Sequence, residues 1–256
     1  GGYLLMDVTT KNHIVEQDRR VLQYMRRIVG SDEFINGIER WCFWITDDKA
    51  DAALEIPIIK ERADLVRDLR LGKSDKSAQR LAAYPYRFRE MHETTTNSLV
   101  IPSVSSENRE YVPVGFVDKK TVVTNLAFVI YDCDPWIFGV VSSKMHNLWI
   151  KAVCGGLETR IRYSSELGYN TFPFPAITDE QKKDIRNCVN QVIAAREEEF
   201  DKTYAQMYKK DEMSDDLRFA HSMLDLQIER CYRDEPFVSD DERLDCLFEL
   251  YEKIGG

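Results

Sequence analysis

Two closely spaced prolines, Pro173 and Pro175, separate two kinds of sequence. Proline lacks a backbone donor and disfavours the helical conformation in the residue before it, so no helix is expected to continue through this point. After the prolines, apolar residues recur at helical spacing in three segments, 179–207, 214–233 and 239–254. This pattern predicts a small helical bundle. The sequence therefore predicts two domains, residues 1–175 and residues 176–256.

The first of these parts mixes helical and strand patterns. Period-two alternation and short apolar runs predict strands over 40–45, 98–101, 111–116, 121–123 and 127–131. Helical spacing predicts helices over 12–29, 57–71, 135–143 and 144–153, while 31–37 and 73–80 are expected to be loops. The expected fold class is α+β: a mixed, mostly antiparallel sheet with flanking helices, followed by the helical bundle.

Charge is distributed unevenly between the two parts. The net charge of the chain is −9. Residues 1–175 hold 23 Lys and Arg against 23 Asp and Glu, whereas residues 176–256 hold 12 against 21. The excess negative charge therefore lies entirely in the tail. An acidic surface does not suit phosphates, so any nucleic acid is expected to lie mostly on the first part.

Several chemistries lack their usual sequence signals. None of the six cysteines forms C-x-x-C or lies at ligand spacing from a histidine, so we expect reduced thiols and no metal site. His146, alone among apolar neighbours, is expected to be structural. No apolar run approaches the ~18 residues that span a bilayer, and we expect no membrane partner. Glycine-rich phosphate loops and the G-x-S-x-G motif are absent. We expect no catalytic residues and no cofactor in this segment.

The most informative stretch is Lys151–Pro175, in which Glu158, Arg160 and Arg162 alternate with Thr159 and Ile161. In an extended chain, side chains two residues apart share a face. A carboxylate beside guanidinium groups matches a base-pair edge, because arginine donates to guanine O6 and N7 and glutamate accepts from cytosine N4. A solvated row of charges on an edge strand explains the same spacing, and the residues alone leave both readings open.

Four longer sequence motifs carry a resemblance to a known family. They are SDEFINGIERWCFWI (31–45), VPVGF (112–116), SSKMHNLWIKAVCGGLETRIRYS (142–164) and YNTFPFP (169–175). In this order they resemble the C-terminal part of MmeI-like, type IIL restriction–modification proteins and related adenine-specific DNA methyltransferases. The resemblance covers the chain from about Asn12 onward. It implies a target recognition domain over 1–175, a helical C-terminal domain over 176–256, and double-stranded DNA as partner. Gly156 departs from the family, where arginine is commoner.

The resemblance also implies roles for individual residues. Glu158 and Arg160 would read the base pair beside the methylated adenine, here a C·G pair by donor–acceptor logic, and Arg162 would read or position an inner pair. Glu107, Asn125 and Leu126 would help to read further inner pairs. Basic residues in or near the loops are expected to contact the DNA backbone; these are Lys73, Lys76, Arg80, Arg87, Arg89 and Arg109.

The parent protein implied by the resemblance is a bacterial, cytoplasmic enzyme. It would transfer methyl from S-adenosylmethionine to adenine N6 through a methyltransferase domain upstream in the same chain. An endonuclease in that parent would also use Mg²⁺. The chain begins with Gly1 and Gly2, without methionine, as expected of a piece of something longer. A different class of function stays open: a protein-interaction module in which the acidic helical tail docks a partner.

Overall fold

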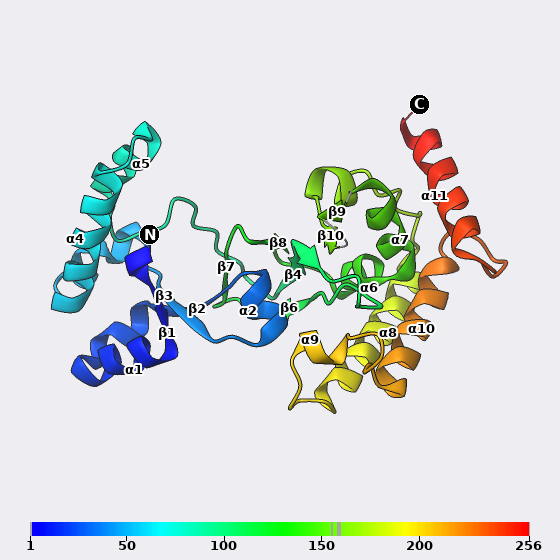
Figure 1. Cartoon of the computed structure of the whole chain (residues 1–256), viewed down its shortest axis with the longest axis horizontal. Helices are drawn as coiled ribbons and strands as arrows, with labels where there is room; N and C mark the ends of the chain where they lie inside the picture. Colours follow the sequence, from blue (N-terminus) through cyan, green and yellow to red (C-terminus); the bar gives the residue numbers. More distant parts are fainter. Residues whose placement is uncertain (1, 155, 158–159, 256) are drawn as a thin grey trace. The chain divides into compact units, whose positions relative to one another are not determined.

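The computed structural model describes residues 2–154, 156–157 and 160–255, with the side chains of residues 156, 157 and 160 left out (Figure 1). The chain forms two compact units. The N-terminal unit comprises Gly1–Val29, Ile38–Thr95 and Asp118–Thr124, and the C-terminal unit comprises Gly30–Gly37, Thr96–Val117 and Asn125–Gly256. Within the described residues no helix is long and apolar enough to cross a membrane.

The N-terminal unit is built on a four-stranded sheet in the order β1-β3-β2-β7. The strands are β1 (Leu5–Asp7), β3 (Arg40–Phe43), β2 (Met25–Val29) and β7 (Val122–Val123). The pair β2–β7 is parallel and the other pairs are antiparallel. The helices are α1 (Val8–Gln17), α3 (Ala50–Leu54), α4 (Pro57–Leu71) and α5 (Lys76–Arg80), with 3₁₀ turns at Gly2–Leu4, Arg19–Tyr24, Asp47–Lys49 and Leu81–Ala83. The core of this unit includes Leu4, Phe43, Ile45 and Ile59, all fully buried.

Two expectations for this unit were wrong. The helix expected over 12–29 ends at Gln17, and its last five residues form strand β2. Asp18 ends it, because its carboxylate accepts a hydrogen bond from the Arg20 N–H (2.9 Å) and starts a 3₁₀ turn instead. The loop expected over 73–80 contains helix α5, for which the Asp75 carboxylate caps the Ser77 N–H at 2.9 Å. The helix expected over 57–71 is confirmed as α4.

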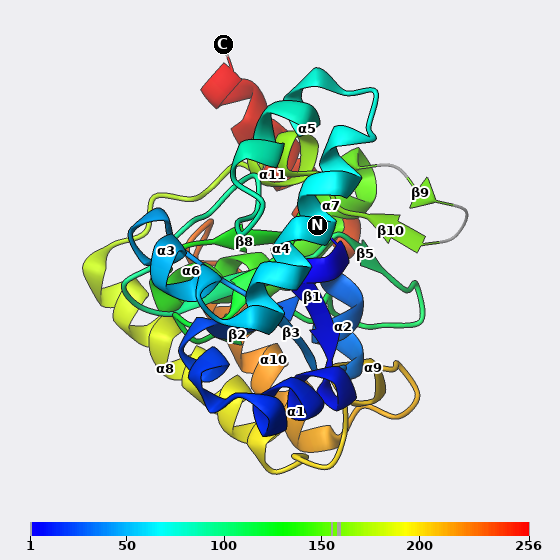
Figure 2. The ribbon, with the colours of Figure 1, turned by 90° about the vertical axis from the view of Figure 1, so that its left-hand side faces the viewer.

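Over its described residues, the C-terminal unit contains two three-stranded sheets. One has the order β6-β4-β8, from β6 (Gly115–Val117), β4 (Ser98–Pro102) and β8 (Ala127–Ile130). The other has the order β5-β10-β9, from β5 (Val104–Ser105), β10 (Arg160–Arg162) and β9 (Gly156–Leu157), and Figure 2 shows these three side by side. All strand pairs in both sheets are antiparallel.

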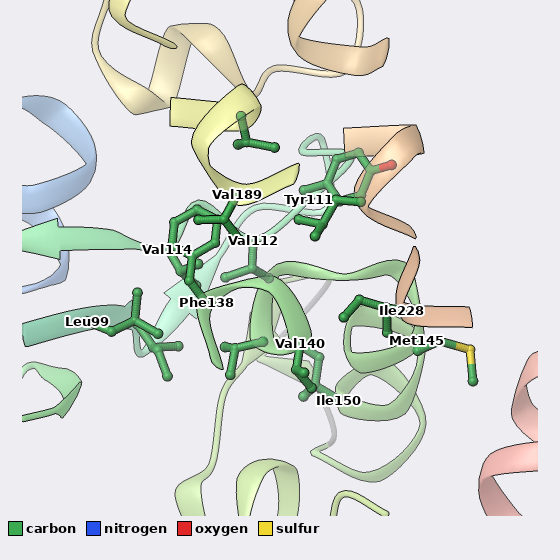
Figure 3. Packing of buried hydrophobic residues seen from close by; sticks show 14 of the residues in the cluster. Leu99, Tyr111, Val112, Val114, Phe138, Val140, Met145, Ile150, Val189 and Ile228 are labelled. Carbon is green, nitrogen blue, oxygen red and sulfur yellow. The ribbon is translucent and has the colours of Figure 1, made fainter. Parts of the chain in front are cut away.

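The remaining elements of the described part of this unit are helices. They are α2 (Ser31–Asn36), α6 (Pro135–Ser142), α7 (Lys144–Val153), the π-helix η5 (Ser165–Tyr169), α8 (Asp179–Glu197), α9 (Tyr204–Met207), α10 (Asp215–Glu229) and α11 (Asp240–Gly255). Helix α8 packs against both α6 and α10, and α11 packs against α7. The core gathers Leu99, Phe138, Val140, Met145 and Ile150 with residues from the tail helices, among them Val189 and Ile228 (Figure 3).

Most expectations for the C-terminal unit are confirmed, including both helices over 135–153 and the three long helices of the tail. The first of these tail helices ends at Glu197, and α9 is separate. The expected loop over 31–37 is helix α2, in which Glu33 accepts from the Gly30 N–H at 2.8 Å. The strand expected from Tyr111 begins only at Gly115. Before Gly115, a side chain and not a neighbouring strand accepts a backbone hydrogen bond: the Val112 N–H donates to Asn147 Oδ1 at 3.2 Å.

The described residues form three small sheets instead of one, and the α+β class is confirmed. The expected functional boundary at Pro175 is a different division from the compact units and stays a prediction.

Candidate nucleic-acid interface

Strand β10 lies in the middle of its sheet and carries two of the predicted base-reading residues. Ile161 pairs with Ser105 and Gly156, and Arg162 pairs with Val104. Ile161 packs against the core, so Arg162 lies on the opposite face, where its side chain is exposed. The backbone of Arg160 pairs with Leu157, but its side chain and all of Glu158 lie outside the described residues. The extended conformation expected around Arg160 and Arg162 is confirmed.

The end of β10 is held by a buried ring pair. The Tyr163 hydroxyl lies 3.0 Å from His146 Nε2, and both side chains are buried. Burial lowers the pKa of His146 to about 3, so its imidazole is neutral. The ring of Phe172 meets His146 edge-on at 4.6 Å. His146 is therefore structural, as expected: it joins the residue that follows β10, Tyr163, to the ring of Phe172.

The predicted readers Asn125 and Leu126 form an exposed turn before β8. The Leu126 side chain is 61% exposed. Its carbonyl oxygen accepts hydrogen bonds from two hydroxyls, Ser103 Oγ at 2.8 Å and Ser31 Oγ. We call Ser31 and Ser103 the serine clamp. The clamp holds the backbone of the turn while its side chains stay outside.

The serine clamp also connects this turn to β10. The Ser103 N–H donates to Ser31 Oγ at 2.9 Å, and the Ser103 carbonyl accepts from the Tyr163 N–H at 2.9 Å. One serine therefore joins two segments that lie far apart in the sequence, each with a predicted base reader. Neither serine was predicted from the sequence to be part of the site. The available signal was weak: a small hydroxyl residue directly after the strand ending at Pro102.

The loop after β5 places its two charged candidates differently. Glu107 is exposed, whereas Arg109 is half-buried. The backbone of Arg109 forms a bridge with Lys209, and its Nε atom is buried without a hydrogen-bond partner in the described part of the chain. Burial lowers the pKa of Arg109. Only part of this guanidinium is therefore accessible to a phosphate, and its role stays a prediction.

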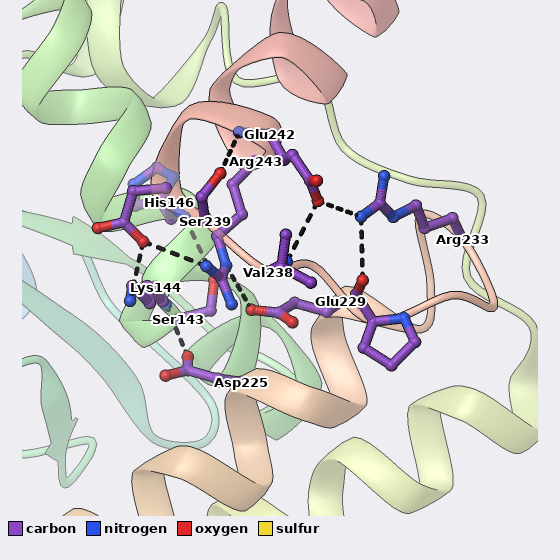
Figure 4. Close-up of polar contacts among 12 residues, drawn as sticks. Ser143, Lys144, His146, Asp225, Glu229, Arg233, Val238, Ser239, Glu242 and Arg243 are labelled. Carbon is purple, nitrogen blue, oxygen red and sulfur yellow. Dashed lines mark hydrogen bonds and ion pairs between the residues drawn. The ribbon is translucent and has the colours of Figure 1, made fainter.

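Helix α7, which leads into β9, is anchored at its first residue (Figure 4). The Lys144 N–H donates to Asp225 Oδ1 at 2.7 Å, and the Tyr111 hydroxyl donates to Asp225 Oδ2 at 2.7 Å. Burial raises the pKa of Asp225 to about 7. Next to it, Arg243 of α11 donates to Glu229 at 2.7 Å. The tail helices thus set the start of the segment that carries β9 and β10.

The remaining basic candidates belong to the N-terminal unit, in and around α5. Lys73, Lys76 and Arg80 are exposed, and within the described ranges none of them forms an ion pair. By contrast, Arg87 pairs with Asp47 at 2.6 Å and Arg89 pairs with Asp75 at 3.2 Å. The first three are therefore free to meet a phosphate, while the last two must exchange a carboxylate for it.

Arg70 organises the backbone next to these basic residues. It is 8% exposed and donates to three carbonyls, those of Leu81 (2.8 Å), Tyr84 (2.7 Å) and Arg87 (2.6 Å). This role of Arg70 was not predicted from the sequence, because a buried arginine on an amphipathic helix has the same sequence pattern as an exposed one. In the described residues, no group of His, Cys, Asp and Glu could hold a metal ion.

Comparison with known proteins identifies the family. The model of the MmeI target recognition domain matches residues 1–176, and the model of the MmeI C-terminal domain matches residues 177–255. The chain belongs to the MmeI family. This confirms the resemblance carried by the four sequence motifs.

Two relatives show how far the likeness extends. DNA methyltransferase A of Bacillus subtilis (strain 168) is 40% identical over 254 residues, which are 99% of this chain and 29% of that protein. A solved structure of the type IIL restriction–modification enzyme MmeI in complex with DNA superposes with a TM-score of 0.93 at 35% identity. The match covers 99% of this chain and 34% of MmeI. The chain therefore spans about a third of the length of these two relatives.

Proposed function

We propose that this chain is the DNA-recognition part of an S-adenosylmethionine-dependent adenine-N6 DNA methyltransferase, and that it selects the site without performing the chemistry. The observation that carries the proposal is its likeness to MmeI bound to DNA, with a TM-score of 0.93 over 99% of the chain. The sequence relative is also named as a DNA methyltransferase. The methyltransferase domain and its cofactor would lie upstream in the same bacterial, cytoplasmic protein. A nuclease in that protein would add Mg²⁺.

Residues 1–175 are the recognition domain in this proposal, and residues 176–256 are a supporting helical domain. The charges favour the division, since the whole negative excess lies after Pro175. The tail then supports the recognition residues without facing the phosphates: Asp225 binds the first residue of α7, the helix that leads into β9, and Arg243 joins α11 to Glu229 of α10.

Base reading is assigned to the turn and strand that the serine clamp joins. Glu158 accepts from cytosine N4 and Arg160 donates to guanine of the same pair, beside the methylated adenine. Arg162, Asn125, Leu126 and Glu107 read inner pairs. Each good bidentate contact gives about 1–3 kcal/mol of discrimination against the wrong base.

Phosphate contacts are assigned to the basic candidates. Lys73, Lys76 and Arg80 are the strongest, because no carboxylate in the described residues neutralises them. Arg87, Arg89 and Arg109 contribute less, since two are paired with acids and the third is half-buried. Such contacts hold the protein on the duplex without reading sequence.

The test is a map of modified adenines. The full-length protein is expressed in a host without DNA methylation, and single-molecule sequencing locates N6-methyladenine. We expect one asymmetric or symmetric motif, methylated at nearly every occurrence. Absence of adenine methylation from an intact, expressed protein would contradict the proposal.

One observation favours a second candidate function, docking of a protein partner. The acidic tail exposes large apolar side chains, among them Phe200 (87%) and Val238 (82%). Salt separates the two candidates. Affinity for DNA falls steeply with salt in proportion to the phosphates contacted, whereas docking of apolar side chains does not weaken in this way.

A further inference from the structure

A hollow of about 370 Å³ lies directly after strand β10. Its lining includes Phe128, Tyr163 and Ser165, and two side chains of opposite charge, Arg162 and Glu166. Both charged side chains are exposed. In the part of the chain that the structure describes, neither has an ion-pair or hydrogen-bond partner, although they line the same space. A donor and an acceptor thus face one hollow without neutralising each other.

The segment that carries Glu166 is held rigidly. Ser164 Oγ accepts from the Leu167 N–H at 3.2 Å, and the Asn170 N–H donates to the Ser165 carbonyl at 2.8 Å. Gly168 packs directly onto α7: a Cβ there would lie 2.8 Å from Cys154 Sγ. A larger residue at this position would require the Cys154 or Ile150 side chain to shift. Glu166 therefore projects from a fixed platform and not from a loose loop.

The other wall of the hollow is equally fixed. The ring of Phe128 lies 5.4 Å from the ring of Tyr163, whose hydroxyl is bound to His146. Arg162 pairs with Val104 in the sheet. Rigid walls of this kind favour recognition, because little side-chain and backbone freedom is lost on binding.

The chemistry of the pair restricts what it can meet on DNA. A carboxylate repels phosphate, so Glu166 can approach a duplex favourably only where a base presents an amino group. In the major groove these groups are cytosine N4 and adenine N6. Arg162, on the same hollow, suits the O6 and N7 acceptors of guanine.

We propose that Glu166 is a further specificity-determining residue, which accepts a hydrogen bond from cytosine N4 or adenine N6 next to the base that Arg162 contacts. This inference rests on the proposed function of DNA recognition. It adds a reader outside the row formed by Glu158, Arg160 and Arg162, on the π-helix that follows the strand.

The experiment compares methylation motifs of the full-length protein with Glu166→Lys and Glu166→Gln. Lysine offers only donors, so Glu166→Lys should move one position of the motif from C or A toward G or T, by roughly tenfold or more in relative methylation. Glutamine both donates and accepts, so Glu166→Gln should relax the same position. The control is Glu180→Lys, which makes the same charge change on an exposed residue of α8 that does not line the hollow.

Each outcome decides the inference. A change at one position in the Glu166 variants, with the Glu180→Lys motif unchanged, supports it. If Glu166→Lys abolishes methylation, Glu166→Gln decides: a relaxed position supports the inference, and an unaltered motif overturns it. An unaltered motif in all variants overturns this inference alone. No methylation by the unsubstituted protein overturns the proposed function and this inference with it.

Discussion

The strand β10 region and the α5 region both expose basic side chains, but their surroundings differ. Arg162 extends from a strand that is paired on both sides and backed by the buried Tyr163–His146 contact. Lys76 and Arg80 lie on a five-residue helix, surrounded by solvent. Reading a base requires a fixed direction, whereas meeting a phosphate requires only charge. The rigid support of β10 therefore suits a surface that reads bases, whereas the exposed α5 suits a surface that only contacts phosphates.

The largest expected effect comes from Asp225, a buried residue that binds the start of α7, the helix that leads into the β9–β10 strands. Burial raises the pKa of the Asp225 carboxyl to about 7 in the folded protein, from an ordinary value of 3.8, so the native state binds more protons than the unfolded state between these pH values. The stability that the protonated Asp225 carboxyl contributes is fully present below about pH 4 and is lost as pH rises through 7. Between pH 5 and 8 this group should remove about 3 kcal/mol from the native protein. In Asp225→Asn that loss should disappear.

Urea unfolding at the two pH values measures it. The groups that surround position 225, namely Tyr111, Lys144 and Glu229, are the same in the native protein and in Asp225→Asn. Burial lowers the pKa values of His146 and His221, so these two residues make the protein more stable at higher pH. This effect is the same in the native protein and in Asp225→Asn. Parallel pH profiles for the native protein and Asp225→Asn would mean that Asp225 is not protonated in the fold as its burial implies.

The next effect should come from Arg162→Ala. Loss of a bidentate contact should reduce discrimination at one position of the motif by about 1–3 kcal/mol and leave the other positions unchanged. Methylation of a duplex library randomised at each position measures this. Uniform weakening over all sequences would place Arg162 with the phosphate contacts and remove the contrast between the two regions.

The serine clamp should have a smaller effect on the same readout. Ser103→Ala removes one donor from the Leu126 carbonyl, at a cost of about 1 kcal/mol in stability. The turn at Asn125 then loses part of its support, so the positions it reads should relax. Ser222→Ala is the control, since it loses a similar bond, from an exposed hydroxyl to the Phe219 carbonyl. A motif as sharp as the native one in Ser103→Ala, at equal stability, would show that the clamp does not act on recognition.

The smallest effect is expected from Lys76→Ala in the α5 region. Affinity should fall about equally for cognate and random duplexes, and the slope of log K against log salt should decrease by about 0.9. Fluorescence anisotropy of the full-length protein at several salt concentrations measures both. A loss confined to the cognate duplex would make α5 a reading element.

Sequence patterns predicted elements where local signals agreed and failed where they did not. Pro57 and Gly72 bracket α4 correctly, because proline favours the first turn and glycine the end. Met25 and Ile28 suit a helix by spacing but lie in a strand, since pairing with β3 and β7 decides the conformation. Such pairing is non-local and cannot be seen in a window of sequence.

The candidate site shows the same limit. The row around Arg162 was visible from alternation, but the part played by Ser103 depends on contacts with Ser31, Leu126 and Tyr163, which come from three other segments. Glu166 looked like one of many exposed acids until the structure placed it on the same hollow as Arg162.

Base reading by Glu158 and Arg160 is tested by the double substitution Glu158→Lys with Arg160→Asp in the full-length protein, followed by a map of modified adenines. We expect C beside the methylated adenine for the native protein and G for the double variant, with the rest of the motif unchanged. A soluble, active variant that keeps C at this position would contradict base reading by this strand.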